Sequence, residues 1–174
     1  MKYKIIKELR KKIKENDSGS IICIDCKSRT EYSQFEKSIK NSISKMNYYY
    51  VGKSKRNLFH TYTVYEELKS ILGKDVDSYI KKKELSPSRM SRPLESLSGE
   101  RWRASLYIAE LLNKKIILFP WIEPEIINMY SKIWLIQDLK KMENNKVKIL
   151  LPTCFEKCTD SSLFSESIIP TKFV

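Results

Sequence analysis

Apolar residues in the first third of the chain recur at a spacing that switches between helix and strand. Residues 3–14 predict a helix with one apolar face, formed by Ile5, Ile6, Leu9 and Ile13. A short apolar run at 21–25 predicts a strand, and a second strand is expected at 48–51. Between them, residues 31–46 predict a helix with the apolar face Phe35, Ile39, Ile43 and Met46.

The same alternation continues to residue 151. Short helices are expected at 63–72 and 76–83, and residues 84–93 are interpreted as a polar linker with two prolines. The pattern then predicts a helix, a strand, a helix and a strand at 101–112, 115–119, 123–142 and 147–151. The tail after Cys158 is expected to be a loop or an added edge strand. Alternating helices and strands predict an α/β layered fold.

Four segments within residues 15–154 are similar, in order and spacing, to the motifs of one known family. They are Asp17-Ser-Gly-Ser-Ile21, Asn57-Leu-Phe-His-Thr-Tyr-Thr-Val-Tyr-Glu-Glu-Leu68, Ser96-Leu-Ser-Gly-Glu-Arg-Trp-Arg103 and Ile116-Ile-Leu-Phe119. On these segments the chain resembles the ATPase (nucleotide-binding) domain of ABC transporters. The resemblance implies a truncated, P-loop NTPase-like core with a small helical subdomain.

Several positions that carry chemistry in that family differ here. No glycine-rich loop with a Lys, which would close backbone N–H groups around phosphate, precedes the matched region. On the resemblance, Lys53 replaces the glutamine near the metal and Cys154 replaces the switch histidine. Pro120 and Trp121 replace the Asp-Glu pair of the magnesium site. Phosphoryl transfer needs phosphate, metal and water to be held together, so we expect a noncatalytic pseudo-ATPase without a cofactor.

One short match to a phosphate loop is a decoy. Gly52-Lys53-Ser54 agrees with the last three residues of the pattern. The pattern also requires a glycine five positions before Gly52, where this chain has Asn47. The residues between Asn47 and Gly52 are bulky strand formers. A buried strand that ends at a glycine turn explains this segment better.

The expected organisation is a single domain over residues 1–174. Its α/β core would comprise 1–56 and 101–158, and its helical subdomain with the signature-like loop would comprise 57–100. Within that loop, Ser98, Gly99 and Glu100 are the candidate site, because Ser98 could cap the following helix while free N–H groups face an anion. The resemblance implies contact with the nucleotide of a partner subunit; an ordinary helix cap is the alternative.

Charge adds a second candidate function. The formal net charge is +12, and residues 1–56 contain 15 basic and 6 acidic side chains. Such a field favours nucleic acid, an anionic membrane surface or an acidic partner, whereas a solvated helix face is the structural alternative. Lys53, Lys55 and Arg56 stand next to the tyrosines at 48–50 and form a candidate basic surface on which bases could stack.

The four cysteines form two close pairs, Cys23 with Cys26 and Cys154 with Cys158. Pairs of this kind can hold structural zinc, but the flanking glycines of zinc knuckles are absent. Buried free thiols are the favoured interpretation, with no metal in the site.

Together these features predict a noncatalytic, cytoplasmic ABC-ATPase-like protein that binds and modulates a protein partner. An intact ABC-type ATPase subunit is one candidate partner, and homo-oligomerisation is left open. The alternative is a basic nucleic-acid or ribosome-associated module. No apolar run in the sequence approaches the ~20 residues of a membrane span.

Overall fold

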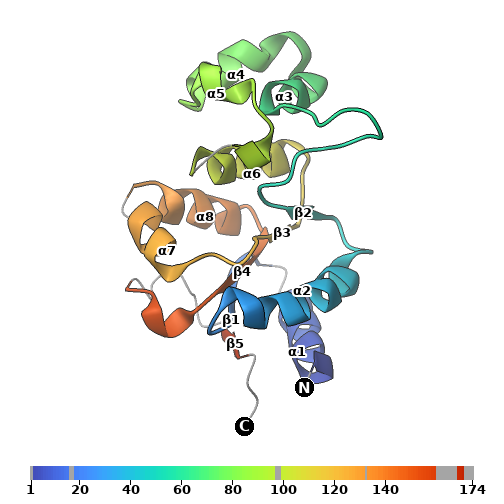
Figure 1. The fold of residues 1–174 in the computed structure, drawn as a ribbon, viewed down its shortest axis with the longest axis vertical. Coiled ribbons are helices and arrows are strands. Elements are labelled where there is room, and N and C mark those ends of the chain that lie inside the picture. Colours follow the sequence, from blue (N-terminus) through green and yellow to red (C-terminus); the bar gives the residue numbers. More distant parts are fainter. Residues whose placement is uncertain (1, 16–17, 97–98, 132, 160–167, 171–174) are drawn as a thin grey trace. The chain divides into compact units, whose positions relative to one another are not determined.

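The computed structural model describes residues 2–15, 18–96, 99–131, 133–159 and 168–170, and Figure 1 shows their arrangement. The chain forms two compact units. The first, here called the sheet unit, comprises Met1–Tyr49 and Lys114–Val174. The second, the helical unit, is the continuous segment Tyr50–Asn113.

The sheet has five strands in the order β2-β3-β4-β1-β5. In chain order they are β1 (Ser20–Asp25), β2 (Tyr48–Tyr50), β3 (Ile116–Leu118), β4 (Lys148–Thr153) and β5 (Ile168–Pro170). β4 is the middle strand, and β1 lies between β4 and the edge strand β5. β1 pairs in parallel with β4, from Ser20 opposite Lys148 to Asp25 opposite Thr153. β3 with β4 and β5 with β1 are also parallel. The tail after Cys158 was expected to be a loop or an added edge strand, and the short β5 is such an edge strand.

Both faces of the central strands are covered. Ile21, Ile22 and Ile24 of β1 are at most 1% exposed, and all six residues of β4 are buried. A strand buried on both faces has a continuous apolar sequence instead of an alternating one. This explains why apolar runs, and not period-two patterns, mark the strands of this chain.

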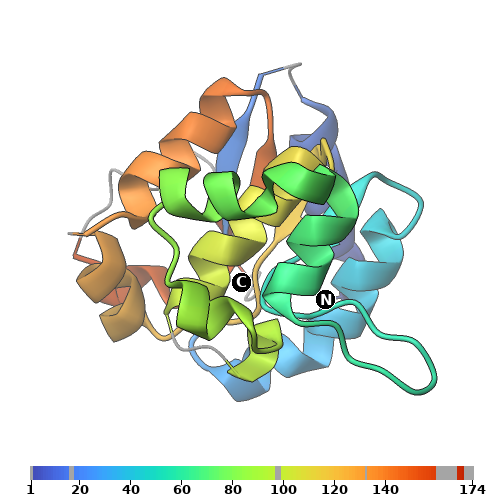
Figure 2. The same ribbon diagram turned by 90° about the horizontal axis from the view of Figure 1, so that it is seen from above.

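The covering helices of the sheet unit are α1 (Lys2–Lys14), α2 (Arg29–Ile43), α7 (Pro124–Ser131) and α8 (Leu135–Asn144). Parallel crossovers are right-handed, so connections that run in opposite directions along a sheet place their helices on opposite faces. The α2 crossover leads from β1 toward β2, whereas α7 and α8 lead from β3 toward β4. Figure 2 accordingly shows α7 and α8, in orange, on one side of the strands and α1 and α2, in blue, on the other.

The helical unit contains α3 (Val64–Leu72), α4 (Val76–Lys82), α5 (Pro87–Met90) and α6 (Glu100–Leu111), with the 3-10 turns η1 (Gly73–Asp75) and η2 (Leu94–Ser96). Its core is a separate apolar cluster that includes Leu68, Met90 and Leu106, all fully buried. An ion pair of 3.4 Å between Lys83 Nζ and Glu110 Oε2 joins the end of α4 to α6.

The predicted α/β class is confirmed, and most predicted elements form within a few residues of their expected bounds. The single helix expected at 123–142 is wrong, because the chain forms α7 and α8 instead. The buried residues 127, 131, 135, 139 and 142 continue at helical spacing across the break, so periodicity alone gives no sign of it. The linker at 84–93 contains the short helix α5.

The boundaries of the two compact units differ from the expected boundaries of the α/β core and the helical subdomain. Residues 50–56 and α6 were assigned to the α/β core, but they belong to the helical unit. A buried hydroxyl explains part of this grouping, since Ser105 of α6 accepts a hydrogen bond from Gly52 N–H. Within the described residues, no helix is both long and apolar enough to cross a lipid bilayer.

Candidate functional site

The carboxyl ends of β1 and β4 form the position at which open α/β sheets bind ligands. These neighbouring strands are followed by connections that run in opposite directions, β1 toward β2 and β4 toward β5. Ligands of such sheets bind outside the carboxyl ends of the strands at this switch point. The residues found there are Asp25 to Ser28 after β1 and Thr153 to Cys158 after β4.

The turn from β1 into α2 is short and is held by hydrogen bonds between its own residues and the first turn of α2. Only Cys26 and Lys27 separate the end of β1 from Ser28, the N-cap of α2. Ser28 Oγ accepts a hydrogen bond of 3.2 Å from Glu31 N–H, and Glu31 Oε2 accepts one of 2.7 Å from Lys27 N–H. Exposed N–H groups at a helix start attract anions. Here a carboxylate of the same helix already occupies that position.

Side chains of the sheet unit also close the space next to this turn. Asp25 Oδ1 accepts a hydrogen bond of 2.9 Å from Phe155 N–H, which ties the end of β1 to the residue after Cys154. Thr153, which is fully buried, donates its hydroxyl to the Ile122 carbonyl over 2.8 Å. These contacts satisfy the polar groups at the strand ends internally.

The end of β3 carries no carboxylate pair in the described structure. Pro120 and Trp121, which stand at the magnesium-site position of the resemblance, are half-buried. Ile122 N–H then bonds to the Pro152 carbonyl at 3.0 Å. Glu123 and Glu125 follow, and both are exposed. Mg²⁺ prefers oxygen ligands such as carboxylates, in octahedral geometry. Residues 120–122 instead provide apolar side chains, which are unsuited to bind this ion.

The cysteines gather near the same strand ends without forming a metal site. Cys23, Cys26 and Cys154 are buried and Cys158 is half-buried, all as free thiols. Burial, and next the negative charge of Asp25, raises the pKa of Cys23 far above its ordinary value. Burial also raises the pKa of Cys158. The thiolate is the form that binds metals and reacts, and no group of three metal-binding side chains occurs among the residues that the structure describes.

The signature-like segment is only partly visible. Ser98 lies outside the described residues, so its expected role as a cap has no structural description. Gly99 occupies the N-cap position of α6 and makes no side-chain cap bond. Glu100 Oε1 accepts from Ser86 N–H at 2.7 Å, and its Oε2 accepts from Arg89 at 3.2 Å. The Glu100 carboxylate therefore serves contacts within the helical unit.

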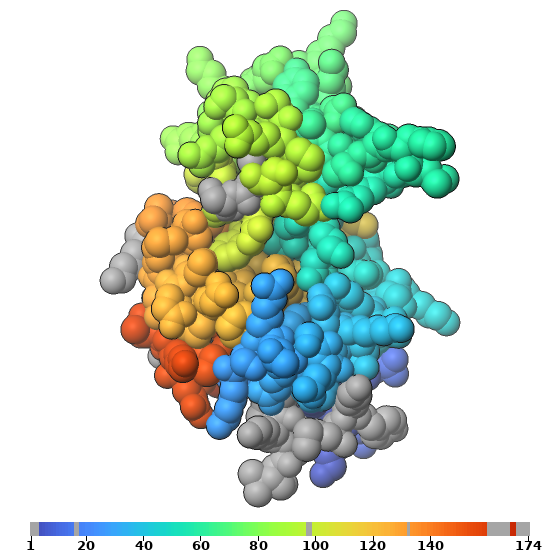
Figure 3. All heavy atoms as spheres, viewed as in Figure 1, coloured from blue at the N-terminus to red at the C-terminus, as the bar shows by residue number. Residues whose placement is uncertain are grey.

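A loop over residues 52–63, here called the 52–63 loop, connects β2 to α3. Gly52 begins it with φ of +77°, a conformation that favours glycine. Figure 3 shows it, in blue-green, projecting from the side of the helical unit. Its Lys-Ser pair is not followed by a helix, because α3 begins only at Val64. This excludes the local geometry of a phosphate loop, in which the Lys and Ser open a helix.

The base of the 52–63 loop is held by two carboxylates. Glu95 accepts hydrogen bonds from Ser54 N–H at 3.3 Å and from Arg56 at 2.7 Å. Glu67, which is 7% exposed, accepts one from Lys55 N–H at 2.8 Å. Burial raises the pKa of Glu67, and the nearby charge of Glu95 adds to this effect. Ser54 Oγ also accepts from Leu94 N–H at 2.6 Å, so the loop is anchored along its base.

The tip of the loop is ordered by its backbone, while its apolar side chains face solvent. Asn57 Oδ1 accepts from both Phe59 N–H at 3.0 Å and His60 N–H at 2.7 Å. Asn57 N–H bonds to the His60 carbonyl, and Arg56 bridges Thr61 in antiparallel fashion. Leu58 is nevertheless 93% exposed and Phe59 97% exposed. A turn this well bonded that displays two large apolar groups is typical of a binding element.

The three cations of the predicted basic surface lie along the same loop, and each has an internal contact. Lys53 Nζ lies 5.4 Å from the centre of the Tyr50 ring, and Lys55 Nζ lies 5.3 Å from the Tyr62 ring. Arg56 is paired with Glu95. Lys53 and Lys55 remain exposed, so the arm of the loop that leads from β2 to the tip is positively charged.

The sequence pattern indicated the cations of this loop but not its apolar tip. The signal was present, since Leu58 and Phe59 stand between the polar turn residues Asn57 and His60. The resemblance explained Leu58 and Phe59 as part of a family motif and therefore concealed their exposure.

No protein-family model matches the chain, and no curated protein matches it. Among solved structures, it is similar to cbiO1 from Clostridium perfringens, described as part of the ABC transporter complex cbiONQ. The two chains share 14% sequence identity at a TM-score of 0.46, and the match covers 78% of this chain and 67% of the other. The likeness is one of fold, and no residue role follows from it.

Proposed function

We propose that this protein is a noncatalytic, ATPase-like module that acts by binding and modulating another protein. The observation that carries the proposal is the tip of the 52–63 loop, where a turn held by the hydrogen bonds of Asn57 presents Leu58 and Phe59 to solvent. Large apolar side chains at the centre of an interface contribute most of its binding energy. Burying each of them would contribute about 1.5–3 kcal/mol.

Absence of ATP hydrolysis is the second part of the proposal. It is supported by the turn between β1 and α2, where Glu31 takes the N–H group that an incoming phosphate would need. It is also supported by the apolar end of β3, where Pro120 and Trp121 stand. Phosphoryl transfer depends on groups that stabilise phosphate charge, and a carboxylate at the helix start opposes that charge.

The sequence resemblance favours an intact ATPase subunit as a partner. This partner would bind at a segment other than the 52–63 loop. That segment is 98–100, which in the resembling family faces the nucleotide of the opposite subunit. Under this proposal, the chain supplies the segment to a neighbouring subunit that holds the nucleotide. The 52–63 loop would be an additional docking element.

Photo-crosslinking at the loop tip tests the binding proposal. The full chain would carry p-benzoylphenylalanine at position 59 and be illuminated in its own cells, with the same amino acid at Ile133, 65% exposed in the sheet unit, as the matched control. We expect one discrete adduct from position 59, identified by mass spectrometry, that position 133 does not give. Unmodified chain alone at position 59, or identical products at both positions, would overturn the proposal.

Turnover measurements test the noncatalytic part. We expect purified chain with Mg²⁺ and ATP to release no phosphate above the rate of a buffer control. Lys27→Ala and Lys53→Ala report on the two Lys-Ser sequences that follow strands, Lys27-Ser28 after β1 and Lys53-Ser54 after β2. Phosphate release by the wild type that either variant abolishes would restore an enzyme.

Nucleic-acid binding is a second candidate, favoured by α1. Lys4, Lys7, Arg10, Lys11 and Lys14 of this helix are exposed, while its Ile5 and Leu9 are buried. Binding through phosphate contacts falls steeply as salt rises. A strong salt dependence of single-stranded RNA binding, reduced by Lys7→Ala with Arg10→Ala, would support this candidate; unchanged binding in that variant would exclude α1 as the contact.

A further inference from the structure

We infer that the 52–63 loop of one copy of this chain docks into a cavity of the helical unit of a second copy. The inference rests on the proposed function, because it names the protein that receives the loop tip. It is carried by a match of shape, polarity and charge between two surfaces of the helical unit.

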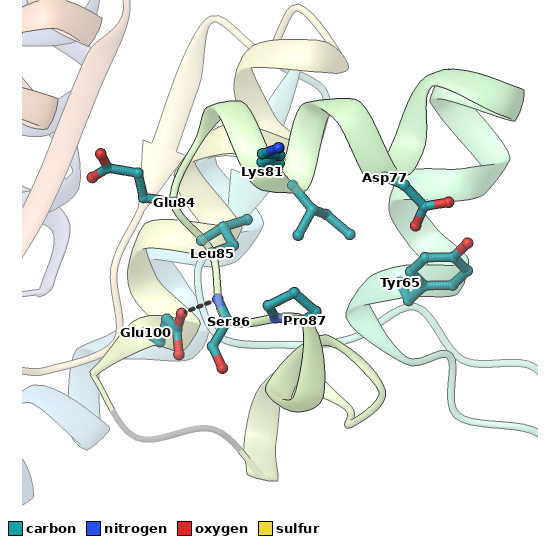
Figure 4. A pocket seen from close by; sticks show the side chains of 9 residues that line it. Tyr65, Asp77, Lys81, Glu84, Leu85, Ser86, Pro87 and Glu100 are labelled. Carbon is teal, nitrogen blue, oxygen red and sulfur yellow. Dashed lines mark hydrogen bonds between the residues drawn. The ribbon is translucent and has the colours of Figure 1, made fainter.

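The receiving surface is a cavity of about 530 Å³ formed by residues of α3, α4, α5 and α6. Ligand pockets in proteins have volumes of about 300–1,000 Å³. Ile80 and Leu85, each 3% exposed, and Pro87 provide its apolar floor. Figure 4 shows Leu85 among the other labelled side chains and Pro87 to its lower right. The floor is therefore suited to aliphatic or aromatic side chains.

The rim of the cavity is acidic. Asp77 and Glu84 line it together with the cation Lys81. Glu100 also lines it, and its carboxylate is paired with Arg89 at 3.2 Å. Figure 4 shows the Tyr65 hydroxyl beside the Asp77 carboxylate at one end of the cavity and Glu84 at the other. Desolvation, followed by the Asp77 charge and a hydrogen bond to it, raises the pKa of Tyr65. This rim stands out in a chain whose net charge is +12.

The 52–63 loop offers groups that complement the apolar floor and the carboxylates of the cavity. Its tip offers two apolar side chains, and Lys53 and Lys55 at its base are exposed. An apolar tip with two exposed cations on the arm that leads to it complements an apolar floor with carboxylates on its rim. Complementary charge sets specificity and association rate. The tip is 93–97% exposed in its own copy, so it does not fill its own cavity.

Such a contact joins two different surfaces, so it is heterologous. Each copy carries one tip and one cavity, and variants of the two surfaces can therefore be combined. A copy with a damaged tip still has an intact cavity, whereas a copy with a damaged cavity still has an intact tip. The experiment below uses this property.

Sedimentation velocity of the full chain over a concentration series tests the inference. We expect the wild type to self-associate, and Phe59→Ala to weaken association about 10–100-fold. Asp77→Lys, an exposed rim position, should weaken it as well, without loss of helical content by circular dichroism. Ile133→Ala, which removes an exposed apolar group of the sheet unit, should associate as the wild type does.

Mixing the two defective variants provides the decisive comparison. Equal amounts of Phe59→Ala and Asp77→Lys should associate more strongly than either alone, because the mixture contains intact tips and intact cavities. No gain on mixing, wild-type association of Phe59→Ala, or a monomeric wild type at all concentrations would overturn the inference. The photo-crosslinking adduct at position 59 distinguishes failure of this inference from failure of the proposed function. An adduct with a different protein preserves the proposed function but not self-docking. Absence of any adduct overturns both.

Discussion

The hydroxyl of Ser105, fully buried in α6, accepts a hydrogen bond of 2.9 Å from the backbone N–H of Gly52. This bond fixes the residue at which the 52–63 loop begins. Gly52 is held there with φ of +77°, and the bond supplies the partner that its N–H needs. The direction of the loop thus depends on one side chain of a helix far along the sequence.

Ser105→Ala should destabilise the protein by about 1–3 kcal/mol, because it leaves the Gly52 N–H without its partner. Urea denaturation followed by circular dichroism measures this change. Ser33→Ala, at an exposed serine of α2, is the matched control and should change the unfolding free energy by less than about 0.5 kcal/mol. Equal effects of the two substitutions would contradict a specific role for the Ser105 hydroxyl.

Glu31→Ala should expose the start of α2 to anions. Removing the carboxylate frees the Lys27 N–H and should cost about 0.5–2 kcal/mol of stability, as loss of a cap does. Added phosphate should then raise the melting temperature of the variant more than that of the wild type, because an anion can take the vacated position.

Glu36→Ala is the control for that measurement. Glu36 lies on the same helix and pairs with Lys40 at 2.7 Å, away from the helix start. Its removal should give no extra phosphate response. If phosphate stabilises the wild type and Glu31→Ala equally, then Glu31 does not block the helix start.

Glu67 should make stability fall as pH rises. Its pKa in the folded chain is raised, first by desolvation, above the ordinary value of 4.5. Between 4.5 and that raised pKa, the folded chain binds more protons than the unfolded chain, so the unfolding free energy decreases with pH. Glu67→Gln keeps an acceptor for Lys55 N–H and should remove this decrease and raise stability at pH 7.

The neighbouring Glu66 provides a control of opposite sign. Hydrogen bonds from the Thr63 backbone and then from His60 lower its pKa below 4.5. Its contribution is present above pH 4.5 and is lost as pH falls through the lowered pKa. Glu66→Gln should therefore flatten the acid side of the stability curve. Identical pH curves for both variants would refute the assignment of opposite shifts.

Gly19→Ala should destabilise the sheet unit. A Cβ at this position would lie 2.6 Å from the carbonyl carbon and 2.8 Å from the Cα of Glu143, near the end of α8. Because backbone cannot move aside cheaply, we expect a loss of about 1–3 kcal/mol. Guanidinium denaturation measures it, and Ser18→Ala, at the exposed neighbouring position, should leave the midpoint unchanged.

Local pattern predicted the helices and buried strands, because apolar spacing along a short segment reports which face is covered. It could not locate the break near Trp134, since buried positions continue at helical spacing from Ile127 to Leu139. Nor could it assign α6 to the helical unit, because that grouping depends on contacts such as Lys83 with Glu110. Boundaries between units follow from distant contacts and not from local periodicity.

The candidate sites show the same division. Lys53, Lys55 and Arg56 were predictable as a basic run, whereas the pairing of Arg56 with Glu95 needed the fold. Glu100 was expected near a free helix start, but its carboxylate is bonded to Ser86 and Arg89. The apolar cavity was not foreseen, because its floor combines residues that look like ordinary core positions in the sequence.

The place of β1 between β4 and β5 determines when the sheet can form during synthesis of the chain. Ser20 pairs with Lys148 and Cys23 with Ile168, so both neighbours of β1 emerge from the ribosome long after it. The helical unit is one continuous segment and can complete its own contacts much earlier. Contacts of large sequence separation form slowly, and an apolar strand without neighbours is prone to aggregate. A chain that stalls before residue 148 would expose β1 on both edges, which makes it a natural target for chaperones on the ribosome.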